Sequence, residues 1–553
     1  MNIIYLSAEN FIKVLQGEVA VDQSGVEHSF LDPTGSGVIL QVDPQKRHIV
    51  IEEDVVIGPN LEFDKDIEID NVECRSLTFR GVTFHKYIYI HNGTFGNLAV
   101  EDVTSKDFVI HGGEFSTLRF SGQNNMHECV IKGINCYSIE VNGGKYQKYF
   151  EIDNVKTKNG ITIYKGDFEG SYGVSLSITN NKVYGVFTIG GGIYASRIIV
   201  DVSGINELVI KAGEFIKDIT LQGENSNSTC RVEGGDFRDE FNISGAKLNH
   251  LILDNQFFRL KAENTNVEKC IFLKEINYSL ALYKCKFNEL AFKNIITSTG
   301  RVSIDNSEVD VLLFEQFVNE GYFRVNDLTP RGQSSSQILM VKSVLGNMVL
   351  SGLSFSSYDK IVIDNCKIDS VDTLIEPFPV SNKICTDKDG FRDSLKLSEI
   401  YKQLYFSAKS RGDRANEVTY YAAYMDAYRQ HLRNAKDWPT KVVLCFNKCS
   451  TDYGRNWLRG VGWIILLSVF FYFLYYISLC ISLSPFTFNS KCWYSTDFSA
   501  HVANYVTFLN PVHRIDFMTD DPGWSAIIDL IARILISTLI YQTIVAFRRL
   551  GKF

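Results

Sequence analysis

Two ionisable residues in an otherwise apolar stretch near the C-terminus are the first candidates for chemistry. Asp529 and Arg533 lie four residues apart in WSAIIDLIARILISTLIYQTIVAF, residues 524–547. Side chains four residues apart meet on one face of a helix, so these two can form an ion pair. An ionisable group at the centre of a bilayer costs about 2.5–3.5 kcal/mol on insertion scales, so each charge needs a partner or water. Two interpretations stay open: Asp529 lies at the outer interface and Arg533 reaches towards it, or both face an oligomer interface or a water-filled pore.

A second set of polar residues precedes this stretch, in the segment SAHVANYVTFLNPVHRIDF. Residues 500–509 are predicted to form a short helix that the Asn-Pro pair after it ends. A chain with only two membrane-crossing helices can line a pore only when several chains assemble, so the pore hypothesis requires a homo-oligomer. The further candidates for the pore or oligomer interface are Tyr505, Thr507, Asn510 and His513.

The motifs of common enzyme classes are missing from the chain. There is no GxSxG, no GxxxxGK[ST], no GxGxxG after a strand and no HExxH. Paired carboxylates such as Asp236 and Asp239 could act as acid and base, but acidic residues at turns are mostly solvated. We therefore expect no enzyme, with no catalytic residue and no cofactor.

Charge and cysteine usage exclude further classes. The chain has 56 Lys and Arg against 64 Asp and Glu, a net charge of -8, which argues against a nucleic-acid partner. Its 12 cysteines are scattered singly, with no CxxC pair and no Cys/His group at zinc spacing, so neither disulfides nor a metal site is predicted. The N-terminus has no basic segment followed by an apolar one and is not a secretory signal. The bulk of the protein is expected in the cytoplasm with reduced thiols.

Residues 50–367 consist of short apolar segments bounded by Gly, Asn or Asp, and an aromatic residue often follows the turn. A unit near 21 residues is too short to bury its own apolar face, so stacked copies must align like residues in a continuous core. We predict a right-handed parallel β-helix over residues 41–380, capped by residues 1–40, with loops bulging from coils of 31 and 26 residues. The aromatic residues, at intervals of 20, 31, 22, 26, 21, 22 and 20, are Phe95, Phe115, Tyr146, Phe168, Tyr194, Phe215, Phe237 and Phe257.

Helical spacing replaces the strand pattern after the β-helix. Residues 390–450 are predicted to form a helical hairpin and linker, with helices at 394–409 and 414–433. The pair resembles a single tetratricopeptide-like hairpin, and its aromatic stripe is interpreted as packing, with peptide binding as the alternative. Such a pair would pack on the open end of the solenoid or bring subunits together.

Residues 455–553 are predicted to form a two-span membrane module. Residues 461–483 carry no formal charge, and at 1.5 Å per residue they span about 35 Å, enough for a hydrocarbon core of about 30 Å. Residues 524–547 form the second span, and Arg548 and Arg549 act as the membrane stop. Lys and Arg flank the module at both ends, whereas the loop between the spans has only two such residues. Both termini and the β-helix are therefore expected on the cytoplasmic side of an inner membrane.

This module resembles the two-helix ion-channel domain, in which a re-entrant pore helix and a filter loop separate two spans. The stretch YVTF at residues 505–508 carries the resemblance, but LNPVHRID follows it and lacks the Gly-Tyr-Gly ladder. Potassium selectivity by stacked backbone carbonyls is therefore not expected. The order of solenoid, hairpin, YGRNWLRG and two spans also resembles bacterial membrane-anchored pentapeptide-type repeat proteins with channel-like tails.

Two functional hypotheses follow. The leading one is an oligomeric inner-membrane protein whose cytoplasmic β-helix senses or scaffolds a trigger and whose channel-like module permeabilises the membrane. Sensor-effector proteins of bacterial stress and antiviral defence provide the architectural analogy. The alternative is a passive membrane anchor that displays the β-helix as an interaction scaffold. The expected partners are the lipid bilayer, further copies of the chain and an unidentified cytoplasmic trigger or protein.

Overall fold

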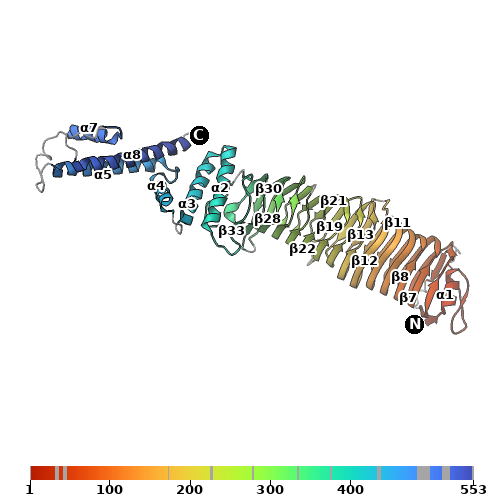
Figure 1. Cartoon of the computed structure of the whole chain (residues 1–553). Coiled ribbons are helices and arrows are strands. Elements are labelled where there is room, and N and C mark those ends of the chain that lie inside the picture. The colour runs from red at the N-terminus through yellow and green to blue at the C-terminus, as the bar shows by residue number, and fades with distance from the viewer. Residues whose placement is uncertain are drawn as a thin grey trace. The chain divides into compact units, whose positions relative to one another are not determined.

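The computed structural model describes residues 2–31, 37–40, 47–171, 173–224, 228–276, 279–332, 335–373, 376–432, 437–482, 498–513 and 523–550. The chain divides into two compact units, the first made of Met1–Val362 and Ser370–Phe378 and the second of Ile363–Asp369 and Pro379–Phe553. The first unit is a stack of β-strands, and helices dominate the second (Figure 1).

Most strands are short and lie in the first unit. In chain order they are β1 (Asn2–Tyr5), β2 (Ala20–Val21), β3 (Glu27–His28), β4 (Gly37–Leu40), β5 (Arg47–Ile57), β6 (Glu62–Phe63), β7 (Asp66–Arg80), β8 (Thr83–Glu101), β9 (Thr104–His111), β10 (Glu114–Lys132), β11 (Asn135–Asp153), β12 (Lys156–Phe168), β13 (Val174–Thr179), β14 (Lys182–Ile189), β15 (Ile193–Tyr194), β16 (Arg197–Asp201), β17 (Ile205–Ile210), β18 (Glu214–Phe215), β19 (Ile219–Gln222), β20 (Ser228–Val232), β21 (Asp236–Ser244), β22 (Lys247–Leu253), β23 (Phe257–Glu263), β24 (Asn266–Phe272), β25 (Ser279–Tyr283), β26 (Lys286–Lys293), β27 (Ile296–Thr297), β28 (Arg301–Glu315), β29 (Val318–Asn319), β30 (Tyr322–Thr329), β31 (Gln337–Val341), β32 (Met348–Leu353), β33 (Lys360–Asp364), β34 (Asp372–Thr373) and β35 (Ile384–Cys385). A 3₁₀ turn, η1 (Phe355–Ser357), separates β32 and β33.

The first unit is a parallel β-solenoid of about 16 turns, which confirms the predicted fold class. The strands of the coils pair in parallel with those one coil further on, so residues one repeat apart lie one above the other, whereas β2 and β3 form a small antiparallel pair. One such ladder runs through Ile67, Ile88, Phe108, Cys129 and Phe150. All five side chains are buried. The near-constant spacing of apolar residues along the chain thus becomes a continuous apolar core.

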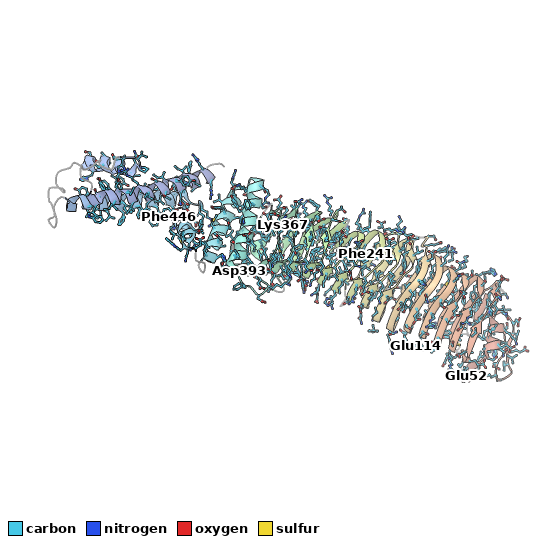
Figure 2. All side chains as sticks on the ribbon, in the orientation of Figure 1. Glu52, Glu114, Phe241, Lys367, Asp393 and Phe446 are labelled. Carbon is cyan, nitrogen blue, oxygen red and sulfur yellow. The ribbon has the colours of Figure 1, made fainter. Side chains whose placement is uncertain are left out.

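Side chains alternate between this core and the surface, as expected for strands. Phe241 is buried, whereas Glu52 and Glu114 are exposed (Figure 2).

The predicted cap region, residues 1–40, contains β1, which pairs in parallel with β5, and helix α1 (Ala8–Leu15). Ser7 caps that helix by accepting a hydrogen bond from the Asn10 amide, and the helix buries its apolar face.

The repeated aromatic residues form an uninterrupted stack in the middle of the solenoid. Neighbouring rings in it have centroids 4.7–5.0 Å apart. Offset aromatic pairs contribute about 0.5–1.5 kcal/mol each beyond the area they bury. The stack consists of Tyr146, Phe168, Tyr194, Phe215, Phe237 and Phe257.

The long interval between Phe115 and Tyr146, just before this stack, is not a longer coil, so the prediction of a bulging loop there was wrong. Phe115 is the register partner of Cys136 in the next coil, and Tyr146 is the register partner of Met126 in the coil before. Phe95 and Phe115 therefore belong to a second ladder of the same coils. Spacing alone did not separate the two ladders, because both place aromatic residues after similar turns.

The interval between Phe168 and Tyr194 is a longer coil, as predicted. These two residues are register partners, so one turn of the solenoid separates them. The sequence separation between register partners is larger for Phe150 and Leu176 than for Tyr146 and Phe168. The extra residues therefore lie in the turn between β12 and β13.

The first two helices of the second unit, α2 (Ser394–Arg411) and α3 (Arg414–His431), lie close to the predicted positions. The Asp393 carboxylate caps α2, and Gly412 ends it with a φ of 76°, a conformation that glycine adopts without strain. A further helix, α4 (Trp438–Thr451), was not predicted, although Asp437 caps it and a proline occupies its first turn.

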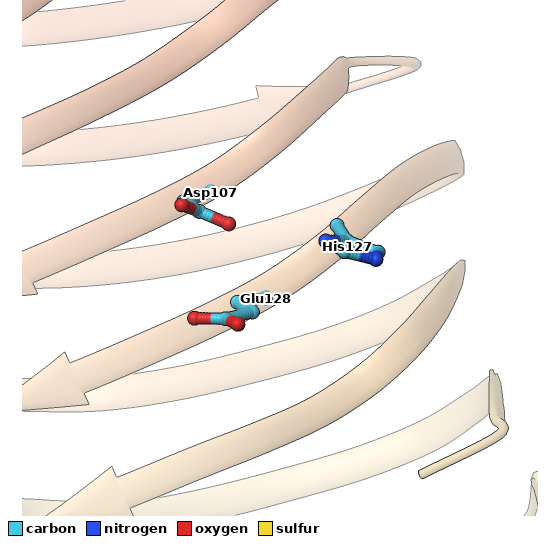
Figure 3. A group of neighbouring side chains, drawn as sticks. All are labelled: Asp107, His127 and Glu128. Atoms are coloured by element: carbon cyan, nitrogen blue, oxygen red, sulfur yellow. The ribbon is translucent and has the colours of Figure 1, made fainter. Parts of the chain in front are cut away.

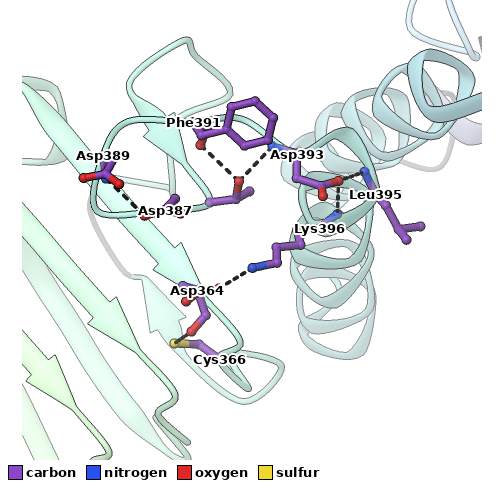
Figure 4. A network of polar contacts seen from close by, with 9 residues as sticks. Asp364, Cys366, Asp387, Asp389, Phe391, Asp393, Leu395 and Lys396 are labelled. Atoms are coloured by element: carbon purple, nitrogen blue, oxygen red, sulfur yellow. Dashed lines mark hydrogen bonds and ion pairs between the residues drawn. The ribbon is translucent and has the colours of Figure 1, made fainter.

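Polar contacts fix the start of α2 within its own unit (Figure 4). The Lys396 ammonium lies 2.7 Å from the Asp364 carboxylate. The Asp393 carboxylate accepts from the amides of Leu395 and Lys396, and the Phe391 carbonyl accepts from the Thr386 hydroxyl. These contacts connect the segment around Asp364 to the first helix of the unit.

Three helices complete the second unit: α5 (Trp457–Ser482), α7 (Phe498–Leu509) and α8 (Gly523–Leu550). They match the predicted spans at 461–483 and 524–547 and the predicted short helix at 500–509. The two basic residues of the intervening loop, Lys491 and Arg514, lie outside the described residues.

Candidate functional site

Helices α5 and α8 are long and apolar enough to cross a membrane, over Trp457–Ser478 and Trp524–Arg549. They pack against each other through small and aromatic residues. Gly460 of α5 lies so close to α8 that a Cβ there would collide with the Thr543 hydroxyl. Trp457 meets Phe547 edge to face, with centroids 5.5 Å apart. Close backbone approach at glycine is typical of packed helices in membranes.

Helix α7 joins this pair through a shared apolar cluster. Tyr475 of α5, Phe508 of α7, and Ala532 and Ile536 of α8 are buried together. This cluster holds α7 against α5 and α8.

Asp529 is buried and has a basic side chain opposite each carboxylate oxygen. The Arg533 guanidinium lies 2.7 Å from Oδ2, and Nε2 of His513 lies 3.1 Å from Oδ1. The side chains of Asp529, His513 and Arg533 are 1%, 2% and 19% exposed. A carboxylate this deeply buried is tolerated only when its charge is compensated, and the Arg533 guanidinium provides that compensation.

His513 is oriented by the end of α7. Its Nδ1 lies 2.6 Å from the Asn510 carbonyl oxygen, and its ring packs against Phe508. Nδ1 thus faces the Asn510 carbonyl oxygen, and Nε2 lies opposite the Asp529 carboxylate. The structure therefore places His513, Asp529 and Arg533 side by side in one cluster of ionisable groups.

Of the other predicted site residues, Asn510 adjoins this charge cluster, whereas Tyr505 and Thr507 make their contacts elsewhere. The Tyr505 hydroxyl pairs with that of Ser468 on α5, 2.7 Å away. Thr507 is exposed and donates to the Ala503 carbonyl of its own helix. The Asn510 side chain accepts from the Val512 amide and shapes the turn that carries His513. The structure thus brings together Asp529, Arg533 and His513, with Asn510 as their support.

The two arginines of the predicted membrane stop differ in their surroundings. Arg549 stacks on the Tyr421 ring, 4.3 Å from its centroid, and donates to the Tyr453 carbonyl. Arg548 is exposed. Arg549 therefore also connects α8 to α3 and to the segment after α4.

One polar contact of α8 was not predicted from the sequence. The Gln542 side chain bonds to Asn447 and Ser450 of α4. An amide within an otherwise apolar span was the available signal, because such a group needs a partner in hydrocarbon.

The solenoid carboxylates Asp236 and Asp239 are less suited to acid and base chemistry, since exposed Asp236 pairs with Arg238 at 3.0 Å.

The fold and these contacts define a β-solenoid protein with two long apolar helices, the second of which carries a buried charged cluster. No family model, no curated protein and no solved structure matches the chain. The resemblances to two-helix channels and to pentapeptide-type repeat proteins therefore rest on the sequence features alone.

Proposed function

We propose that this chain is a membrane-anchored interaction scaffold, in which α5 and α8 cross the bilayer and the solenoid recruits a partner. The observation that carries the proposal is the large exposed apolar surface of both helices. Contiguous exposed apolar patches beyond a few hundred Å² are rare in water-soluble proteins, and lipid is the solvent that removes their cost. The exposed apolar residues are Ile465, Leu466, Val469, Phe470, Phe473, Ile527, Leu530, Ile531, Ile534, Tyr541, Ile544 and Phe547.

The solenoid supports the scaffold half of the proposal. A groove of about 490 Å³ lies across successive coils, and its lining includes Glu114, Asn135, Tyr137, Lys156 and Tyr184. Both tyrosines are largely exposed. Exposed aromatic residues beside charged and amide groups are the side-chain types that mark binding surfaces.

Membrane extraction tests the anchor. We expect the wild-type chain to stay in the membrane pellet after alkaline carbonate treatment. The double variant Phe470→Arg/Ile534→Arg should be released, because each arginine near the bilayer centre costs about 2.5–3.5 kcal/mol. The matched control, Tyr137→Arg/Tyr184→Arg, places the same charges on the exposed solenoid surface and should stay in the pellet. A wild-type chain that carbonate releases would contradict the proposal.

Cysteine labelling tests the proposed orientation in an inner membrane, in which both termini and the solenoid lie on the cytoplasmic side. Cys449 is exposed and Cys445 is partly exposed, whereas the eight cysteines from Cys74 to Cys385 are buried. Cys492 belongs to the loop between the spans and lies outside the described residues. A membrane-impermeant maleimide should label Cys449 in inside-out vesicles and Cys492 in right-side-out vesicles. Cys445→Ser/Cys449→Ser and Cys492→Ser variants separate the two signals, and the reverse pattern would contradict this orientation.

A second candidate function, permeation through an oligomer of the two-span module, has one observation in its favour. Charged residues within membrane segments often mark ion pathways, and Asp529 and Arg533 lie within α8. The scaffold is preferred because these charges are paired inside one chain and need no second copy to compensate them.

Ion flux from proteoliposomes that contain protein of known oligomeric mass decides between the two. The double variant Asp529→Leu/Arg533→Leu removes both charges together and leaves neither unpaired. Permeation predicts an oligomer whose flux this variant changes. A monomer would exclude the permeation candidate and leave the scaffold.

A further inference from the structure

Three side chains from two neighbouring strands of the solenoid converge outside the groove and the membrane module. Asp107 belongs to β9, and His127 and Glu128 belong to β10 (Figure 3). One nitrogen or oxygen atom from each lies within 4.8 Å of the other two. Imidazole and carboxylate groups at this separation can bind one metal ion together.

The parallel register explains why two carboxylates meet here. Glu128 is the register partner of Asp107, one coil further on. Register partners in adjacent strands lie about 4.7–4.9 Å apart, and like charges at such positions repel. Burial, and then the Glu128 charge, raise the pKa of Asp107.

The protein compensates only part of this negative charge. Glu128 accepts from the Lys148 ammonium at 2.8 Å and from the Tyr149 hydroxyl at 3.3 Å. Asp107 Oδ1 and His127 Nδ1 are shielded from solvent and have no hydrogen-bond partner within the described parts of the chain. A buried polar group without a partner costs about 1–3 kcal/mol, so a ligand that satisfies both atoms would stabilise the fold.

We propose that Asp107, His127 and Glu128 form a binding site for a divalent transition-metal cation that links two successive coils. One imidazole nitrogen and two carboxylate oxygens suit Zn²⁺ or Mn²⁺ better than Mg²⁺ or Ca²⁺, which prefer oxygen ligands alone. Three protein ligands leave a coordination position for water or a further ligand. The Lys148 ammonium competes with the metal for Glu128, so metal binding displaces it.

No metal site was predicted from the sequence, because the sequence signals of such sites are ligands at short spacings. Here Asp107 and His127 lie in successive coils, and only the stacking of those coils brings them together. The site is independent of the membrane proposal, since all its residues lie in the solenoid.

Calorimetric titration of the full chain in detergent micelles tests the site, after removal of bound metals with a chelator. Zn²⁺ is the probe and Mg²⁺ the comparison. We expect Asp107→Asn and His127→Phe to weaken Zn²⁺ binding by about tenfold or more, as the loss of metal-site groups does elsewhere. Lys148→Met should strengthen it, because the competing ammonium is gone. That gain distinguishes a metal site from a merely structural contact.

The matched control is His48→Phe, which removes a surface His–Glu pair. His48 lies 2.9 Å from Glu73, and this substitution should leave the affinity of the site unchanged. Circular dichroism of each metal-free variant checks that the solenoid is folded. Equal Zn²⁺ binding by the wild type, Asp107→Asn and Lys148→Met would overturn the proposal, and so would a Lys148→Met variant that binds none.

Discussion

Replacing Arg533 by leucine is expected to lower the free energy of unfolding of the helical unit by about 3–5 kcal/mol. The substitution leaves the Asp529 carboxylate buried with His513 as its remaining basic neighbour. The cost of an uncompensated charge in a low-dielectric environment exceeds the packing gained from leucine. Thermal unfolding in detergent micelles, followed by near-ultraviolet circular dichroism, measures the effect.

The double variant Asp529→Leu/Arg533→Leu provides the internal test. It should recover most of the loss, because replacing both members of a buried ion pair by apolar residues is often neutral or stabilising. Arg455→Leu is the surface control in the same unit, since Arg455 pairs with partly exposed Asp452 at 3.7 Å and such pairs contribute about 0–1 kcal/mol. An Arg533→Leu variant as stable as the wild type would show that the charge cluster contributes nothing to the fold.

Replacing Tyr194 by alanine should destabilise the solenoid by about 3–5 kcal/mol, as for other large-to-small changes of buried aromatic residues. Tyr194 is fully buried and stacks on Phe168 at 4.8 Å and on Phe215 at 5.0 Å. A cavity at this position interrupts the aromatic stack on both sides. Because each coil contacts only its neighbours, the loss falls on the local interface of the stack.

Tyr184 gives the matched control for this prediction. It lies in the same region of the solenoid with 64% of its surface exposed, so Tyr184→Ala should change the stability by less than about 0.5 kcal/mol. Tyr194→Phe, which removes the hydroxyl bonded to the Gly191 carbonyl at 3.0 Å, should cost about 1 kcal/mol. Urea unfolding followed by far-ultraviolet circular dichroism compares the three variants. Equal losses for Tyr184→Ala and Tyr194→Ala would contradict the role of the aromatic stack.

The fold was largely predictable because its signals are local and repeated. Apolar residues at a nearly constant spacing indicated stacked coils, and uncharged or nearly uncharged stretches indicated α5 and α8. The change from the strand pattern to helical spacing indicated α2 and α3. Helix α4 was missed, because its short apolar pattern lies between two stronger ones.

Ladder membership was less predictable. When each coil offers two positions for an aromatic residue, the spacing of aromatic residues along the chain does not tell which of the two ladders each residue joins. The step from Phe115 to Tyr146 therefore looked like a longer coil, although each residue has its register partner in the adjacent coil. Pairing of strands, which depends on the whole stack, decided the register.

Part of the charge cluster was visible in the sequence and part was not. Asp529 and Arg533 are four residues apart on one helix, and helical geometry alone places them together. His513 comes from a different segment, and it reaches Asp529 because the apolar cluster around Phe508 holds α7 against α5 and α8.

By itself, the sequence determined the repeating coil, the two apolar helices and the Asp529–Arg533 pair, because periodicity and hydrophobicity act over short stretches of chain. Only the tertiary structure decided which aromatic residues stack, where His513 lies and that Asp107, His127 and Glu128 meet. Those contacts join residues in different coils or in separate helical segments. Their geometry is set by packing between elements, which no local pattern contains.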